Sequence, residues 1–285
     1  SIIIPTKDNK PILENCIKSI FSKTTYKNYE LIIVDNQSSD YETIEYLKYL
    51  SSLERIKVLN YKASFNFSAI NNFAAKHAKG EVLVFLNNDT EIITPQWLEI
   101  MLGCLEQPKV GAVGVKLLYP NDTIQHAGVI IGLHGTADHP FKGYGRYEEG
   151  YMGRACLQQD LSAVTGACMM TWKYLFEEFG GFDEVNLPVA FNDVDYCLKL
   201  RSKGYRVVFT PYVELYHYES LTRGREKSKR YREERKKEAL FIREKWKNFV
   251  QNDPFYNPNL ELKGEAFSLS LEPRVTKPWK EKTYG

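Results

Sequence analysis

The chain of 285 residues lacks the features that mark several large classes of protein. Its five cysteines are odd in number and scattered without a CxxC pair, which favours buried thiols over a disulfide framework or a zinc site. No apolar run approaches the roughly 18 residues that would span a bilayer, and no signal peptide is visible. These absences predict a cytoplasmic protein, with peripheral contact at the inner face of the cell membrane as an alternative.

A net charge of one sign is also missing. Lys and Arg number 38 against 36 for Asp and Glu, so the formal charge of +2 indicates no particular partner, and no nucleic-acid recognition motif accompanies the basic residues. The distribution is uneven, because residues 223–247 hold twelve basic and five acidic side chains. Helical spacing of apolar residues predicts that the second half of this segment docks on the body. For residues 223–237 we keep two hypotheses, a mobile lid over a diphosphate and contact with anionic lipid.

What the first half does contain is an alternation of strand and helix patterns. Continuous apolar runs of strand length are typical of strands that are buried on both faces of a parallel sheet. Segments with apolar residues at helical spacing lie between them. The expected strands are 2–4, 31–34, 56–59 and 82–86, and the expected helices are about 12–20, 41–51 and 67–78. This order predicts an α/β fold, a doubly wound and mostly parallel sheet with helices on both faces.

The second half is less regular. A helix at about 95–107 and a strand at 110–118 are followed by residues 119–160, which are rich in Gly, His and Tyr and are expected to form loops with short strands. Further patterns predict a strand at 161–172, a helix at about 192–203 with Asn192 as its N-cap, and a strand at 205–209 that ends at Pro211. The chain begins inside a strand pattern without an initiator Met, so we expect a segment of a longer protein.

Polar stretches follow three of the expected strands, at the edge where doubly wound sheets bind ligands. They are residues 5–9, 35–40 and 87–89, and none is a glycine-rich phosphate loop, which argues against a dinucleotide or P-loop site. Asp89 could hold a hard divalent cation through oxygen or simply end the strand in a turn. Asp35 is likewise either a turn residue or an acceptor for a nucleobase N–H.

Two further positions have a chemical and a structural interpretation. Asp193 and Asp195 lie in the first turn of a predicted helix, where the helix dipole favours negative charge. Asp193 could also be a general base that accepts a proton from a substrate hydroxyl. His217 stands among apolar and aromatic neighbours, so it is either a core residue or a metal ligand.

These motifs occur along the chain in a recognisable order. They are Pro5-Thr6, Val34-Asp35-Asn36, Phe85-Leu86-Asn87-Asn88-Asp89, Thr165-Gly166-Ala167-Cys168-Met169, Gly180-Gly181-Phe182-Asp183-Glu184, Asn192-Asp193-Val194-Asp195-Tyr196 and Gly204-Tyr205-Arg206. The ordered set resembles a family-two glycosyltransferase with the GT-A fold. His217-Tyr218-Glu219-Ser220, Arg223-Gly224 and Asp253-Pro254-Phe255-Tyr256-Asn257-Pro258-Asn259-Leu260 resemble a bacterial subgroup linked to surface polysaccharide and O-antigen synthesis. The resemblance covers roughly residues 1–260.

The resemblance implies a role for each matching residue. The base and ribose of a nucleoside-diphosphate sugar would be bound by Pro5, Thr6 and Asp35, with Asn66 and Asn71 lining the same pocket; the alternative role of these two Asn residues is helix capping. Asn88 would face the ribose or a metal-bound water. A divalent cation, Mg²⁺ or Mn²⁺, would be held by Asp89 and His217. Both positions before Asp89 are Asn where the family often has another Asp. The site would therefore offer the cation one negative charge fewer. The donor-sugar and acceptor pocket would include Gly166, Ala167 and Asn192, with Asp193 as the catalytic base.

The resemblance also implies the organisation and the reaction. Residues 1–222 would form the GT-A domain, with a nucleotide-sugar half (1–118) and an acceptor and catalytic half (119–222), followed by a basic helical extension (223–285). Other domains of the same polypeptide are expected partners. The reaction would be inverting transfer from a UDP- or dTDP-sugar to a glycan or lipid-linked glycan. The alternatives are a sugar-nucleotide nucleotidyltransferase, which would need a glycine-rich loop near the first strand, and a non-catalytic glycan-binding domain.

Overall fold

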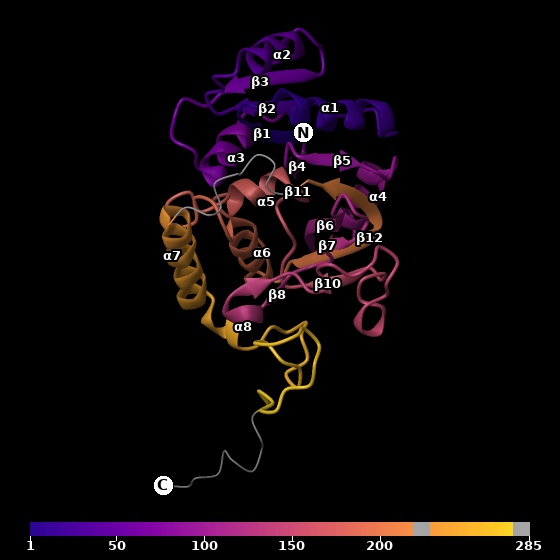
Figure 1. Cartoon of the computed structure of the whole chain (residues 1–285), viewed down its shortest axis with the longest axis vertical. Coiled ribbons are helices and arrows are strands. Elements are labelled where there is room, and N and C mark those ends of the chain that lie inside the picture. Colours follow the sequence, from indigo (N-terminus) through magenta and orange to yellow (C-terminus); the bar gives the residue numbers. More distant parts are fainter. Residues whose placement is uncertain (219–228, 276–285) are drawn as a thin grey trace.

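The computed structural model of the chain describes residues 1–218 and 229–275, without the side chains of residues 229–231 (Figure 1). The sequence predictions for residues 219–228, including most of the proposed lid or lipid-binding segment, and for residues 276–285 lie outside this part. No helix in the described part of the chain is long and apolar enough to cross a membrane.

One large sheet forms the centre of the molecule (Figure 1). Its strand order is β10-β12-β6-β11-β4-β1-β2-β3, with β5 paired to β12 and β7 paired to β6. The pairs β1·β2, β2·β3, β1·β4 and β6·β12 are parallel, whereas β11 runs antiparallel between β4 and β6 and the short strands β5, β7 and β10 pair antiparallel. The strands are β1 Ile2–Thr6, β2 Leu31–Asp35, β3 Ile56–Asn60, β4 Val82–Leu86, β5 Thr90–Ile92, β6 Val110–Leu118, β7 Ile124–His126, β10 Gln159–Leu161, β11 Cys168–Trp172 and β12 Arg206–His217; β8 Ile130–Ile131 and β9 Ala137–Asp138 form a separate ribbon.

Helices cover both faces of this sheet, which confirms the predicted α/β class. Alternate residues of each buried strand enter two separate cores, so that Ile3 packs in one core while Ile2 and Ile4 pack in the other. The first core lies under α3, α5 and α6, and the second lies under α1, α2 and α4. The helices are α1 Lys10–Lys23, α2 Tyr41–Ser51, α3 Phe67–Ala75, α4 Trp97–Leu105, α5 Lys173–Glu178, α6 Asn192–Ser202, α7 Lys229–Lys245 and α8 Lys247–Gln251.

Two strand predictions in the second half were wrong in extent. The predicted strand 161–172 is two strands, β10 and β11, and the intervening backbone turns away from the ladder, with Gly166 N–H bonded to the Asp193 carboxylate. The strand predicted to end at Pro211 continues to His217. Pro211 is tolerated because it lies in a register shift between Thr210 and Glu214, where the ladder with β6 is interrupted.

The start of α6 also differs from the prediction. Asn192 is the first helical residue instead of the N-cap, because Phe191 takes the cap position with a left-handed φ of 59°. The side-chain Oδ1 of Asn192 accepts the next backbone N–H, from Asp193, at 2.9 Å. The helix predicted over 67–78 ends earlier, at Ala75. The three-residue strand β5 was not predicted, since so short a strand has no readable periodicity.

The C-terminal helix docks on the body as its apolar spacing predicts. In the second half of α7, Ile242 is fully buried. Trp246, Phe249 and Val250 pack against the core that also contains α6. Farther along, Tyr256 and Leu260 form a small core with Ile130 and Leu133 of the 119–160 region.

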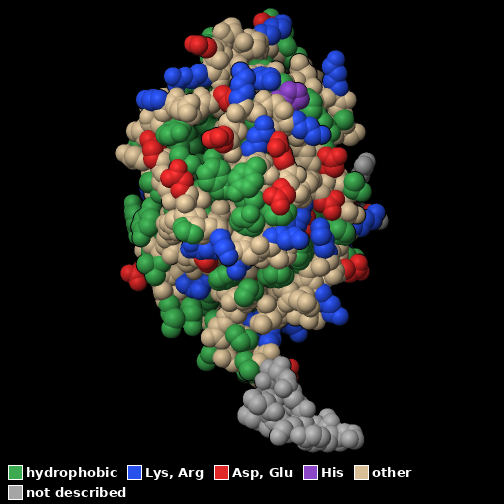
Figure 2. Space-filling model, turned by 180° about the vertical axis from the view of Figure 1, so that it is seen from behind, with side chains coloured by type: hydrophobic (Ala, Val, Ile, Leu, Met, Phe, Trp, Pro, Cys, Tyr) green, Lys and Arg blue, Asp and Glu red, His purple; other side chains and the backbone are tan. Residues whose placement is uncertain are grey.

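The face of the molecule that lies behind the view of Figure 1 carries acidic and basic side chains interspersed among hydrophobic ones (Figure 2).

Two glycines offer a test of packing in this fold. Gly114 lies in the central strand β6, where a methyl group would collide with Val164, so Gly114→Ala should lower the free energy of unfolding by about 1–3 kcal/mol. Gly103 is exposed in α4 with open space around it, so Gly103→Ala should raise it by about 0.5–1 kcal/mol. Urea unfolding would measure both, and equal effects of the two variants would contradict the packing at β6.

Candidate active site

A cavity of about 230 Å³ opens beside the ends of β4 and β12. Its walls come from segments that are far apart in the sequence: the turn after β4, the 125–142 region, the turn before β11, and the start of α6. Of the residues predicted from the sequence, this cavity brings together Asp89, Gly166, Ala167, Asn192, Asp193 and His217. The predicted residues that do not line it are Pro5, Thr6, Asp35, Asn66, Asn71 and Asn88.

Four of the residues outside the cavity, Pro5, Thr6, Asp35 and Asn88, lie at the carboxyl edge of the parallel strands. Thr6 pairs with Asp35 in the register of β1 and β2. Asn88 donates a hydrogen bond from Nδ2 to Thr6 Oγ1 at 3.0 Å, so the polar ends of β1 and β4 are in direct contact. The Asp35 carboxylate accepts the backbone N–H of Ser38 at 3.0 Å. The three turns predicted to form one ligand edge therefore meet, and Pro5 lies in β1 at the same edge.

Asp8 is a residue of this edge that the sequence reasoning did not single out. It has a left-handed φ of 52°, and its Oδ1 accepts the backbone N–H groups of Ser39 and Asp40 at 2.6 and 2.9 Å. The turn after β1 is thereby tied to the turn after β2. A strained backbone at a ligand edge is typical of a preorganised site.

Asn66 and Asn71 have structural contacts in α3. Asn66 is the N-cap, accepts Ala69 N–H at 2.9 Å and donates to Glu184 O at 2.9 Å. Asn71 is fully buried and donates to Phe67 O at 2.8 Å, while its Oδ1 has no hydrogen-bond partner. Helix capping was the alternative role for these residues, and their contact with a nucleotide stays a prediction.

The pair Asp89 and His217 lies at one end of the cavity. The antiparallel pairing of β5 with the end of β12 sets His217 opposite Thr90, and His217 Nε2 lies 3.1 Å from Asp89 Oδ1. Gln125 holds the imidazole from the other side: its Nε2 donates to the backbone oxygen of His217 at 3.3 Å, and its Oε1 faces His217 Nδ1 at 2.6 Å. With the amide oriented in this way, Gln125 Oε1 can only accept, so Nδ1 is the donor in this contact. Nε2 faces Asp89 Oδ1 and also lies 3.2 Å from Asn87 Nδ2.

This arrangement is compatible with a metal ligand. Asp89 Oδ1 and His217 Nε2 face each other at the cavity, and both atom types can bind a divalent cation. A His ligand that donates its second ring N–H to a fixed acceptor is the usual arrangement around metals. Within residues 1–218 and 229–275, no three or more His, Cys, Asp or Glu side chains cluster for metal binding.

Asp193 stands on another wall of the same cavity. Its Oδ2 accepts Gly166 N–H at 2.8 Å and its Oδ1 accepts Val194 N–H at 2.8 Å. A Cβ at position 166 would be only 3.3 Å from the Asp193 Cβ, so the glycine allows this close approach. Burial raises the pKa of Asp193 above the ordinary aspartate value, and the backbone hydrogen bonds offset only part of that rise.

Asp138 is another carboxylate of the cavity, and its pKa is shifted in the direction opposite to that of Asp193. It accepts a bond from Lys142 Nζ at 2.6 Å and contacts His134 Nδ1 at 2.7 Å. Although burial opposes the shift, these partners lower the pKa of Asp138 to about 2. A carboxylate with that pKa is a weak base, so Asp193 is the better proton acceptor of the two.

The 125–142 wall was predicted only as an irregular region rich in Gly, His and Tyr. Besides Gln125, it contributes His126 and His139, whose Nδ1 atoms lie 2.6 Å apart. Burial lowers the pKa of His126 well below its ordinary value and that of His139 to about 4, so both are neutral near pH 7. Arg235 of α7 is a further lining residue that the sequence did not reveal. Only the richness in His could have drawn attention to this wall.

The chain matches a known family over its first part and known proteins over nearly its whole length. Residues 1–180 match the family model described as glycosyl transferase family 2. The chain is 44% identical to the uncharacterized protein y4gI of Sinorhizobium fredii over 95% of its length, and 36% identical to the O-antigen biosynthesis protein RfbC of Myxococcus xanthus over its whole length. It spans only 30% and 22% of those two relatives.

The fold is similar to that of a solved structure with little sequence identity. The crystal structure of GalNAc-T7 with UDP, GalNAc and Mn²⁺ superposes with a TM-score of 0.63 at 16% identity, covering 76% of this chain and 43% of that one. This likeness supports the GT-A architecture alone. The match over residues 1–180, with the ordered motifs and the sheet topology, establishes the family: the chain belongs to glycosyl transferase family 2.

Proposed function

We propose that this domain is the catalytic part of an inverting glycosyltransferase that moves a sugar from a UDP- or dTDP-sugar to a hydroxyl of a glycan in bacterial surface polysaccharide synthesis. Family membership assigns it to the glycosyltransferases. The observation that carries the mechanism is one cavity with two kinds of group in its lining. Asp193, the proposed base, and the proposed metal ligands Asp89 and His217 all line it. The name of the Myxococcus xanthus relative supports O-antigen as the polymer.

The proton transfer follows from the position of Asp193. A sugar hydroxyl has a pKa far above 7, so a base must take its proton as the new C–O bond forms. The Gly166 and Val194 N–H groups hold both carboxylate oxygens in place, while burial makes the group a stronger base than an exposed aspartate. Direct attack on the anomeric carbon inverts it, so one base is sufficient and no covalent intermediate forms.

The donor would bind across the carboxyl edge of the sheet. Thr6, Asp35 and Asn88 would hold the nucleoside, and the diphosphate would reach toward Asp89 and His217, which would hold Mg²⁺ or Mn²⁺. When bound, such a cation supplies Lewis-acid stabilisation of the negative charge on the departing diphosphate. The GalNAc-T7 structure, which contains Mn²⁺, supports this choice of cofactor.

Removal of the proposed base should stop sugar transfer but leave the binding of the donor nucleotide intact. Asp193→Asn should lower the rate of UDP release from a sugar nucleotide with Mn²⁺ by 10²–10⁴-fold, while calorimetric affinity for UDP stays within about twofold. Asp138→Asn is the matched control, because it changes the other cavity carboxylate, whose pKa is low. Wild-type turnover in Asp193→Asn, or an equal loss in the control, would reject Asp193 as the base.

The raised pKa of Asp193 also predicts the pH profile. The base works only when deprotonated, so kcat/KM for the donor should fall as the pH drops through a pKa that lies above the ordinary aspartate value of 3.8. UDP release between pH 4 and 8 would show this limb. A rate that stays constant down to pH 4 would contradict the assignment.

The metal pair can be tested by binding alone. Asp89→Ala should largely abolish the gain in UDP affinity that Mn²⁺ provides in calorimetry. Gln125→Leu should lower Mn²⁺-dependent affinity by about 10–100-fold, since the imidazole would lose the acceptor that orients it. Gln96→Leu, at an exposed position before α4, is the control. Unchanged Mn²⁺ dependence in Asp89→Ala would remove the metal role from this pair.

A further inference from the structure

Helix α7 follows the 1–180 segment that matches the family model, yet its side chains reach both walls of the cavity. Glu238 contacts the wall that precedes Asp193, and Arg243 contacts the 125–142 wall through a bond from Nε to Thr136 Oγ1 at 2.8 Å. Thr136 directly precedes the cavity residues Ala137 and Asp138. One helix thus links two walls that come from distant parts of the sequence.

The Glu238 contact is the more informative of the two. Its side chain is only 3% exposed, and its carboxylate accepts the backbone N–H groups of Val189 and Ala190 at 3.1 and 2.6 Å. Both residues line the cavity and precede Phe191, which has a left-handed backbone. Backbone N–H groups in such an irregular turn need acceptors, and here a side chain from α7 provides them.

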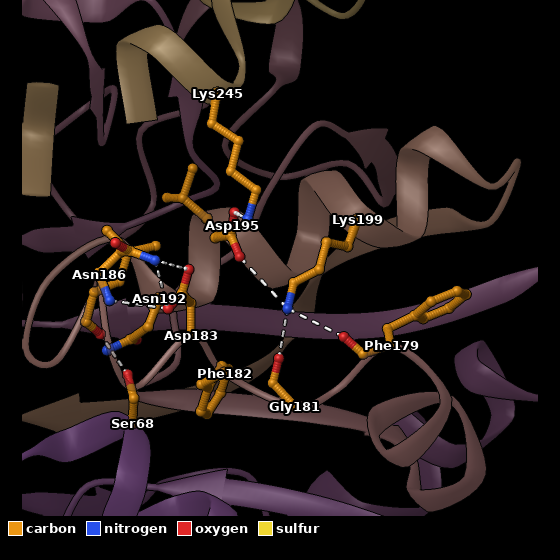
Figure 3. Close-up of polar contacts among 12 residues, drawn as sticks. Ser68, Phe179, Gly181, Phe182, Asp183, Asn186, Asn192, Asp195, Lys199 and Lys245 are labelled. Atoms are coloured by element: carbon orange, nitrogen blue, oxygen red, sulfur yellow. Dashed lines mark hydrogen bonds and ion pairs between the residues drawn. The ribbon is translucent and has the colours of Figure 1, made fainter. Parts of the chain in front are cut away.

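The far end of α7 is anchored on α6 near Asp193. Asp195, two residues after Asp193, is fully buried and contacts Lys245 Nζ and Trp246 Nε1, each at 2.7 Å. Figure 3 shows Lys245 and Lys199 approaching Asp195 from different sides. Lys199 also donates to Gly181 O at 2.7 Å. The helix that carries the proposed base is therefore held between α7 and the Gly180–Gly181 turn.

A side chain of α7 also enters the cavity wall. Arg235 lines the cavity, with its guanidinium carbon 5.9 Å from the centre of the Phe191 ring. It lies one turn before Glu238 on the same helix. These contacts of Arg235, Glu238 and Arg243 lead to residues 136 and 189–191.

We propose that α7 is part of the acceptor site, and that Glu238 is a positioning residue that holds Val189 and Ala190 so that the wall beside Asp193 fits the acceptor sugar. This proposal rests on the proposed glycosyltransferase function. It differs from a lid over the nucleotide, because the helix organises the wall that directly precedes Asp193. It also differs from a purely structural contact that stabilises the fold, because loss of the Glu238 contact should change acceptor binding and leave donor binding unchanged.

Glu238→Gln tests the contact with little change in volume. A carboxamide has one acceptor oxygen, and its NH₂ group would face the second backbone N–H, so one of the two wall amides loses its partner. Glu244→Gln is the matched control, since it removes the same charge from an exposed position of the same helix. Arg243→Gln is a second variant that breaks the other anchor, to Thr136.

Hydrogen–deuterium exchange gives a readout that needs no substrate. In Glu238→Gln, peptides that cover residues 186–194 should exchange at least fivefold faster than in the wild type, and in Arg243→Gln the same should hold for residues 133–142. The Glu244→Gln protein should match the wild type. Equal exchange in Glu238→Gln and the control would overturn the proposal, whether or not the enzyme is active.

The kinetic readout separates acceptor from donor. The donor is the UDP- or dTDP-sugar that the wild type hydrolyses fastest, and the acceptor probes are octyl glycosides of glucose, galactose and N-acetylglucosamine. In Glu238→Gln, the ratio of transfer to hydrolysis should fall at least tenfold through a higher acceptor KM, with UDP affinity and hydrolysis within twofold. A parallel fall of hydrolysis and UDP affinity would overturn the positioning role. Absence of hydrolysis and of transfer in the wild type would instead refute the proposed function.

Discussion

The short pairing of β5 with the end of β12 is the contact on which the candidate site depends. It joins the turn after β4 to the last residues of a strand that begins more than a hundred positions later, and it places His217 beside Asp89. Because β12 also pairs with β6 through most of its length, the position of His217 is set by the central sheet. The candidate site is thereby built on the ends of strands of the central sheet, and the irregular 125–142 wall borders it with Gln125 against the imidazole.

Buried carboxylates organise the part of the chain that lacks regular structure. Asp193, Glu238 and Asp253 each accept backbone N–H groups from turns: Gly166 and Val194, Val189 and Ala190, and Ile131 and Phe255, respectively. Burial raises the pKa of all three, which is the cost of removing a charge from water. Their N–H partners offset that cost, so the same hydrogen bonds that stabilise the carboxylates also shape the walls of the cavity.

Several residues of the candidate site lie beyond the segment that matches the family model. The parallel strands β1 to β4 and their helices form the edge predicted to bind the nucleotide, within residues 1–180, whereas α6, the end of β12 and α7 lie after it. Asp193, His217 and Glu238 all belong to this later part. The relatives of which this chain spans 30% and 22% are similar across it, so the later part is shared with them even though the family model ends earlier.

The residue pattern alone predicted the first half of the fold and named the candidate reacting groups. Strands that are buried on both faces are apolar throughout, so the apolar runs at 31–34 and 82–86 could be recognised as such strands. Because these strands are parallel, the polar residues that follow them were expected to lie at one edge of the sheet. The ordered motifs then pointed to Asp89, Asp193 and His217. Only the tertiary structure decided the roles of Gln125, Glu238 and Arg243, and the course of β12 past Pro211. The reason is physical: the role of an amide or carboxylate depends on which backbone groups it faces, and neither local propensity nor spacing contains that information.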